Sequence, residues 1–127
     1  MPSWSENLTA ITLFADDLMA CREFYIEVFG APIIYEDEVS AVFEFGGVAV
    51  NILQSSEAPE LVAPATVGTS HAGPRMQLTI TVDNVDAVVS TLRSLGVELL
   101  NGPIDRPWGI RTAAFFDPAG HLWEIAH

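Results

Sequence analysis

The chain has 127 residues, half of them apolar, which is enough to bury the core of one ordinary domain. Its 17 acidic and 5 basic residues give a formal net charge of −12, and such a charge repels nucleic-acid phosphates and anionic membrane surfaces. The sequence has no apolar run long enough to span a bilayer, no signal-peptide pattern and a single cysteine, so we expect a cytoplasmic protein without nucleic-acid or membrane partners.

Residues 8–30 predict a strand followed by a helix. Apolar and mixed side chains alternate from Ile11 to Phe14, as in a strand with two different faces. The pair Asp16-Asp17 then supplies an N-cap for a segment whose apolar residues recur at helical spacing. Gly30 stands where a left-handed C-terminal cap is expected, so the helix should end there.

The next segment returns to the two-residue period of strands. Three strands are expected at 31–37, 40–46 and 47–54, and Gly46-Gly47 suits a tight hairpin between the last two. Residues 55–74 have no period and are rich in small residues and proline, which predicts an irregular, mobile crossover loop.

Residues 76–96 repeat the pattern of residues 8–30. Alternation again leads to a capping pair, Asp83-Asn84, then to a helical stripe and to Gly96. Strands are expected at 97–105, 110–116 and 121–126, with turns at Trp108-Gly109 and from Asp117 to Gly120. The predicted order of elements is therefore βαβββ, twice.

Three segments of the chain resemble the vicinal-oxygen-chelate superfamily. They are FADDLMACREFYIEVFG, VDNVDAVVSTLRSLGVELL and RPWGIRTAAFFDPAGHLWEI. That superfamily includes glyoxalase I, extradiol dioxygenases, fosfomycin-resistance enzymes and bleomycin-resistance proteins, so the resemblance indicates a fold more strongly than a function. It implies one α+β domain with module one at 8–54, a crossover loop at 55–74 and module two at 76–126. It also implies a cupped mixed sheet and a homodimer.

Strand alternation separates the residues that face the helices from those that line the cup. If Ile11, Leu13, Leu78, Ile80 and Val82 pack on the helices, the intervening residues point the other way. The inward set then includes Thr12, Phe14, Asn51, Gln77, Thr79 and Glu124. A surface this polar is unusual for a closed core and favours a binding site.

Metal-dependent members of the superfamily hold a divalent ion with four strand residues, and the resemblance carries these positions onto Ala10, Asn51, Gln77 and Glu124. Gln77 and Glu124 have suitable oxygen atoms, but Ala10 has none and Asn51 is neutral. We therefore expect no metal cofactor. Under the alternative of a Ni, Zn, Mn or Fe enzyme, Gln77 and Glu124 would be the ligands and Glu124 the catalytic base. Extradiol chemistry is less favoured, because no histidine lies at these positions.

Glu124 has a structural explanation as well, since its carboxylate could pair with Arg106 or Arg111. Of the three histidines, His71 is expected in solvent, His121 in a turn and His127 frayed.

The stretch from Arg106 to Arg111 is similar to a segment of bleomycin-resistance proteins in which a Pro-Trp-Gly turn borders a groove. Trp108 would offer a flat face for a planar ring, with Tyr35, Phe14 and Phe43 as further candidates. The acidic run 36–38 could attract a cationic group. The alternatives are that Trp108 closes a turn, that the phenylalanines are core and that the acidic run is a solvated hairpin end.

The sequence thus favours a small-molecule-binding protein that sequesters an aromatic or cationic compound without metal, as antibiotic-resistance proteins do. A metal-dependent glyoxalase-like lyase or isomerase is the alternative. The candidate ligand-binding residues are Thr12, Phe14, Asn51, Gln77, Thr79, Trp108, Arg111 and Glu124.

Overall fold

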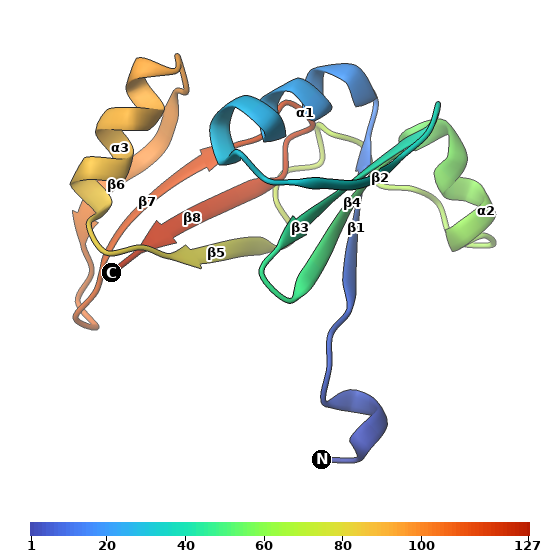
Figure 1. Ribbon diagram of the computed structural model, residues 1–127, viewed down its shortest axis with the longest axis horizontal. Helices are drawn as coiled ribbons and strands as arrows, with labels where there is room; N and C mark the ends of the chain where they lie inside the picture. The colour runs from blue at the N-terminus through green and yellow to red at the C-terminus, as the bar shows by residue number, and fades with distance from the viewer. The chain divides into compact units, whose positions relative to one another are not determined.

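The computed structural model describes residues 1–127 and divides into two compact units, residues 1–68 and residues 69–127. Each unit contains one four-stranded mixed sheet and one long helical segment (Figure 1). Both units have the element order βαβββ, so the predicted α+β fold of two such modules is confirmed. No helix reaches the length and apolar character that a membrane crossing requires.

The first unit builds its sheet from four short strands. Its elements are β1 (Ala10–Ala15), α1 (Leu18–Phe24), the π-helical turn η2 (Tyr25–Phe29), β2 (Ile33–Glu36), β3 (Ser40–Phe45) and β4 (Val48–Gln54). The strand order is β1-β4-β3-β2, with β1 parallel to β4 and the other pairs antiparallel. Helix α1 contacts β3 and β4.

The helix of the first unit begins and ends where the sequence predicts. The carboxylate of Asp17 accepts a hydrogen bond from the backbone N–H of Ala20, at 3.1 Å, and so caps the first turn. Gly30 takes φ +61°, a conformation that a residue without a side chain adopts at low energy. The last turn differs from the regular helix expected, because residues 25–29 form a π turn. That turn carries the fully buried Tyr25, whose ring centroid lies 5.1 Å from Phe29 and 5.3 Å from Phe43.

Two segments flank this sheet. The crossover after β4 is partly helical, with a 3₁₀ turn η3 (Ser55–Glu57) and a short helix α2 (Ala58–Val62). The prediction of a wholly irregular loop is wrong here, because Ala58 is fully buried and anchors the helix to the unit. Before β1, the 3₁₀ turn η1 (Ser3–Ser5) stands at the end of an extended segment (Figure 1).

The second unit repeats this plan. Its elements are β5 (Gln77–Thr81), α3 (Val85–Ser94), β6 (Leu99–Asp105), β7 (Arg111–Phe116) and β8 (Leu122–Ala126). The order is β5-β8-β7-β6, again with one parallel pair, β5 with β8. The side chain of Asn84 caps α3 by accepting from the N–H of Ala87, as predicted. Helix α3 contacts β6 and β7.

Strand β6 is the irregular member of this sheet. Its register against β7 shifts between Leu99 and Asn101 and again between Asn101 and Ile104. Gly102 lies within the second shift, with φ +90°, and β7 passes so close that no side chain would fit there. These irregularities decide which residues of β6 and of the following turn reach each face of the sheet.

The chain's last residue is held rather than frayed, so the prediction for His127 is wrong. Its backbone exchanges two hydrogen bonds with Arg111. Its ring Nδ1 accepts from the N–H of Val85, at 2.8 Å, and thereby satisfies a donor at the start of α3.

Candidate functional site

Each sheet has one face packed under its helix and one face turned away from it, which we call the open face. In the first unit the buried residues Leu13, Ile52 and Phe43 lie on the helix side, since Phe43 contacts Tyr25. Strand alternation puts Thr12 and Asn51 on the open face, where they are direct neighbours across β1 and β4. Phe43 is therefore core.

Asn51 is the most informative residue of the first open face. Its Oδ1 atom is shielded from solvent and has no hydrogen-bond partner. Its neighbours across the sheet are Thr12 on β1 and Val42 on β3. An acceptor left in this state destabilises a protein by about 1–3 kcal/mol, and a bound donor removes that penalty. Half-buried Phe14 lies two residues from Thr12, on the same face.

The open face of the second unit carries a row of polar residues. Thr79 on β5 stands directly opposite Glu124 on β8, and its Oγ1 donates to the carboxylate Oε1 at 3.1 Å. Across the sheet from Glu124 come Ala114 on β7 and then Asn101 on β6. Gln77 lies on the same face two residues before Thr79. The structure thus brings together the three residues predicted for this face.

Arg106 completes this face and was missed as a site residue. Its Nε donates to Oγ1 of Thr112 at 2.9 Å, and its Nη2 lies 3.5 Å from Oδ1 of Asn101. Its Cζ lies 5.8 Å from the ring centre of Trp108, a cation–π distance. Thr112 pairs with Ala126, which pairs with Thr81, so its hydroxyl belongs to the open face. Alternation along β7 is a sequence signal that places the side chain of Thr112 on the open face. No such signal places Asn101, because its face depends on the register shifts of β6.

Arg111 lies on the opposite side of the sheet. Two of its guanidinium nitrogens donate to Asp86 on α3, each at 2.9 Å, and a third donates to Asp105 at 3.0 Å. These bonds raise the pKa of Arg111 and lower the pKa of the Asp86 carboxyl. The alternative that Arg106 or Arg111 pairs with Glu124 is wrong, because Glu124 instead accepts from Thr79.

Trp108 stands in the turn between β6 and β7 with 69% of its surface exposed. Most of the ring is therefore accessible to solvent. The guanidinium of Arg106 lies near the ring. A large exposed aromatic beside a cation is a common platform for a planar ligand.

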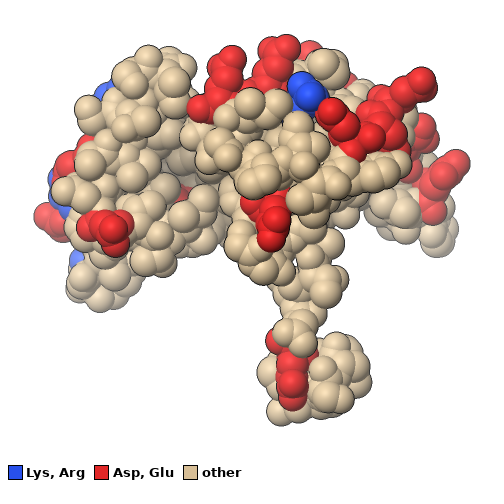
Figure 2. All heavy atoms as spheres, in the orientation of Figure 1, with Lys and Arg blue, Asp and Glu red and all other residues tan.

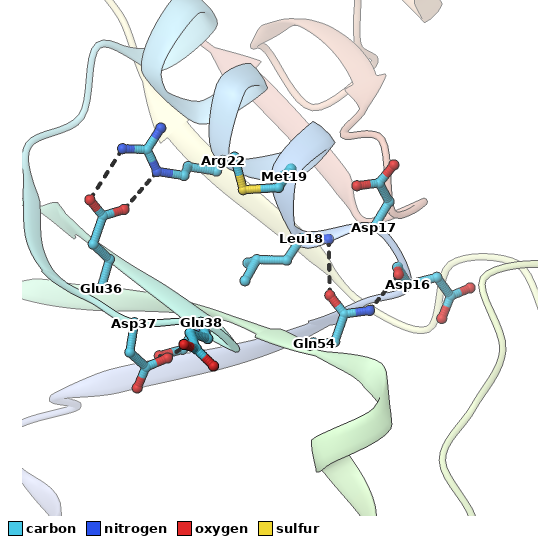
Figure 3. Close-up of a pocket in the computed structure, with 10 residues that line it drawn as sticks. Asp16, Asp17, Leu18, Met19, Arg22, Glu36, Asp37, Glu38 and Gln54 are labelled. Atoms are coloured by element: carbon cyan, nitrogen blue, oxygen red, sulfur yellow. Dashed lines mark hydrogen bonds and ion pairs between the residues drawn. The ribbon is translucent and has the colours of Figure 1, made fainter.

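Acidic side chains gather instead on the helix side of the first unit. Figure 2 shows them around α1 and the end of β2, and Figure 3 shows several of them lining an open hollow. The volume of this hollow is about 750 Å³. Glu36 pairs there with Arg22 at 2.6 Å, which lowers the pKa of its carboxyl. The pKa of Asp37 is lowered because its carboxylate accepts from the N–H of Val39, from Ser40 and from the hydroxyl of Tyr35. The carboxylates of Glu36 and Asp37 are thus already engaged in local hydrogen bonds and an ion pair.

The residues at the superfamily's metal positions do not fit a four-ligand site. Ala10 has no donor atom, and Asn51 offers only a neutral amide. Nowhere do three or more His, Cys, Asp or Glu side chains gather in a metal-binding group. His71 is exposed beside a loop hollow of about 380 Å³ that Phe116 and residues 117–120 also line.

Comparison with known proteins gives one family match over residues 7–125, to the Glyoxalase/Bleomycin resistance protein/Dioxygenase superfamily. Among solved structures, a glyoxalase/bleomycin resistance protein/dioxygenase from Nocardioides is 27% identical, with a TM-score of 0.83 over 94% of this chain and 82% of its own. A glyoxalase-related enzyme from Fulvimarina pelagi is 28% identical, with a TM-score of 0.81 over 95% of this chain and 87% of its own. An uncharacterized Mycobacterium bovis protein is 25% identical over 89% of this chain and 78% of its own length.

Proposed function

This chain belongs to the Glyoxalase/Bleomycin resistance protein/Dioxygenase superfamily, and from that membership we propose that it sequesters small aromatic molecules without a metal ion, with the open face of each sheet as a candidate surface. The observation that carries the proposal is Asn51. A position that holds a metal in the superfamily's enzymes carries here a neutral amide whose oxygen is buried and unpaired. Such an atom accepts a hydrogen bond from a ligand better than it holds a hard cation.

The second open face supports the same function. Glu124 is already bonded to Thr79, and Arg106 is fixed by Thr112 and Asn101. Side chains held in this way are preorganised, so a ligand that meets them loses little binding energy to ordering the protein. Trp108 adds an exposed aromatic surface beside them.

A metal-dependent lyase or isomerase is the second candidate, and one observation favours it. Gln77 and Glu124 lie on the same open face, since Gln77 is two residues before Thr79, the residue directly opposite Glu124. Two oxygen donors on one face are half of a four-ligand site. In that case Glu124→Ala should abolish metal retention.

The first experiment measures metal content in protein purified without metal-affinity resin. A screen of planar aromatic compounds then follows in chelator, with the shift in melting temperature as the readout. We expect no stoichiometric metal and a stabilising compound in chelator. One bound metal per chain, lost in Glu124→Ala, would overturn the proposal in favour of the enzyme. The homodimer implied by the resemblance is part of the proposal, and sedimentation equilibrium tests it.

Asn51→Leu tests the residue that carries the proposal. The leucine has a similar size and removes the unpaired oxygen, so we expect the ligand-free variant to gain about 1 kcal/mol or more in free energy of unfolding. The same variant should lose the stabilisation by the aromatic compound. Thr12→Val, at the exposed neighbour, is the matched control and should change stability by less than about 0.5 kcal/mol. A loss of stability in Asn51→Leu would show that the amide is structural.

A further inference from the structure

Arg106 is unusual among the basic residues of this chain. Arg22 and Arg111 each pair with carboxylates. Arg106 forms no ion pair, a state otherwise found at the exposed Arg75 and Arg93. It is nevertheless half-buried, in a chain with 17 acidic residues. Partial burial weakens the hydration of the guanidinium, and a bound anion would compensate for this loss.

The protein bonds hold Arg106 without using up its donors. A guanidinium has five N–H groups, and the bonds to Thr112 and Asn101 engage one on Nε and one on Nη2. The N–H groups of Nη1 and one of Nη2 are left for another acceptor. Thr112 is only 1% exposed, so the hydroxyl that orients the guanidinium is itself rigidly placed.

Trp108 indicates what accompanies that acceptor. Its ring is 69% exposed and lies next to the guanidinium, with 5.8 Å between Cζ and the ring centre. A ligand that places an anionic group on Arg106 therefore brings its adjacent atoms against a flat aromatic surface. Stacking on this surface favours a ring in the ligand.

Glu124 is not the anionic partner of Arg106, because its carboxylate accepts from Thr79 instead. It shares the open face, but Ala114 on β7 stands between it and Asn101 on β6. Two strand spacings, about 10 Å, separate the rows of Glu124 and Asn101, and Glu124 forms no ion pair with Arg106.

We propose that Arg106 and Trp108 form a subsite for the carboxylate of an aromatic acid, with Asn101 and Thr112 as positioning residues. This rests on the proposed function, because it names the chemistry of a molecule bound on the open face of the second unit. The planar fork of the guanidinium matches a carboxylate by two parallel hydrogen bonds. The ligand is thus an acid, although the chain's net charge of −12 by itself suggests a cation.

The test uses benzoate and its neutral counterpart benzamide, both in chelator. Titrations are followed by the ¹H–¹⁵N signals of the Arg106 Nε–H and the Trp108 indole N–H. We expect saturable shifts of both signals with benzoate and about tenfold weaker binding of benzamide, the difference of one charge-assisted hydrogen bond.

Variants separate this subsite from general charge effects. Arg106→Gln should weaken benzoate binding about tenfold or more. Arg106→Lys should have an affinity between those of the unmodified protein and of Arg106→Gln, because lysine keeps the charge but lacks the planar guanidinium. Arg93→Gln removes the same charge from an exposed position on α3 and should leave the affinity unchanged. The signals of the unmodified protein keep the test valid even where a variant fails to fold.

The outcomes separate the two proposals. Equal binding of benzoate and benzamide, or equal losses in Arg106→Gln and Arg93→Gln, overturns the carboxylate subsite and leaves metal-independent binding intact. Benzoate binding that appears only after a divalent metal is added overturns the metal-independent function instead. No shift at millimolar benzoate overturns the subsite.

Discussion

Gly102→Ala should destabilise the second unit far more than an ordinary glycine substitution. Gly102 lies in β6 at φ +90°, a conformation that a residue with a side chain rarely adopts. An added Cβ would stand 2.5 Å from the carbonyl oxygen of Thr112, 2.6 Å from Cα of Ala113 and 2.9 Å from its Cβ. The first two are backbone atoms of a central strand, so β7 itself would have to move.

The expected magnitude follows from two contributions. The positive φ costs about 1–2 kcal/mol for alanine, and forcing extra volume into a packed site costs about 1–3 kcal/mol more. We expect a loss of about 2–5 kcal/mol in free energy of unfolding, measured by urea denaturation with circular dichroism. Because Thr112 orients Arg106, the signal of the Arg106 Nε–H should shift in the same variant.

Two other glycines provide matched controls for Gly102. Gly96 has φ +81° but nothing within 4 Å of an added Cβ, so Gly96→Ala should show the backbone contribution alone. Gly47 has nothing within 4 Å of an added Cβ and no positive φ, so Gly47→Ala should change the free energy of unfolding by less than about 0.5 kcal/mol. If Gly102→Ala costs no more than Gly96→Ala, the close approach of β6 and β7 is refuted.

Two further substitutions test packing and electrostatics away from the open faces. Tyr25→Ala removes a fully buried ring from the aromatic cluster of the first unit. It should lower the free energy of unfolding by about 3–5 kcal/mol in the same denaturation experiment. A loss under about 1 kcal/mol would contradict the buried packing of this ring. Arg111→Gln should raise the lowered pKa of Asp86 towards its ordinary 3.8, as read by NMR titration. Since the pKa of Asp86 is lowered by folding, its ion pair stabilises the protein above pH 3.8 and this contribution is lost as pH falls through the lowered value. The variant should lack that acid dependence, and an unchanged Asp86 pKa would show that another group lowers it.

The local features of the fold could be predicted from the sequence. The caps at Asp17 and Asn84, the left-handed Gly30 and the βαβββ order all depend on residues close together in the chain. The same is true of the placement of Thr79 and Glu124 on one face, since strand alternation has a fixed period of two. Local geometry is enough for such predictions, because each involves a few neighbouring backbone angles.

Arg106 and Arg111 show what only the tertiary structure decided. Both flank the same Pro-Trp-Gly turn. Alternation along the regular strand β7 gives the side of Arg111, but its partner Asp86 comes from α3. The side of Arg106 depends on the register shifts of β6. Burial of Asn51 Oδ1 without a partner likewise depends on atoms distant in the chain. Periodicity along the chain thus determined which face each regular strand presents, whereas the pairing of charges and the unsatisfied donors and acceptors arose only when separate strands and helices packed together.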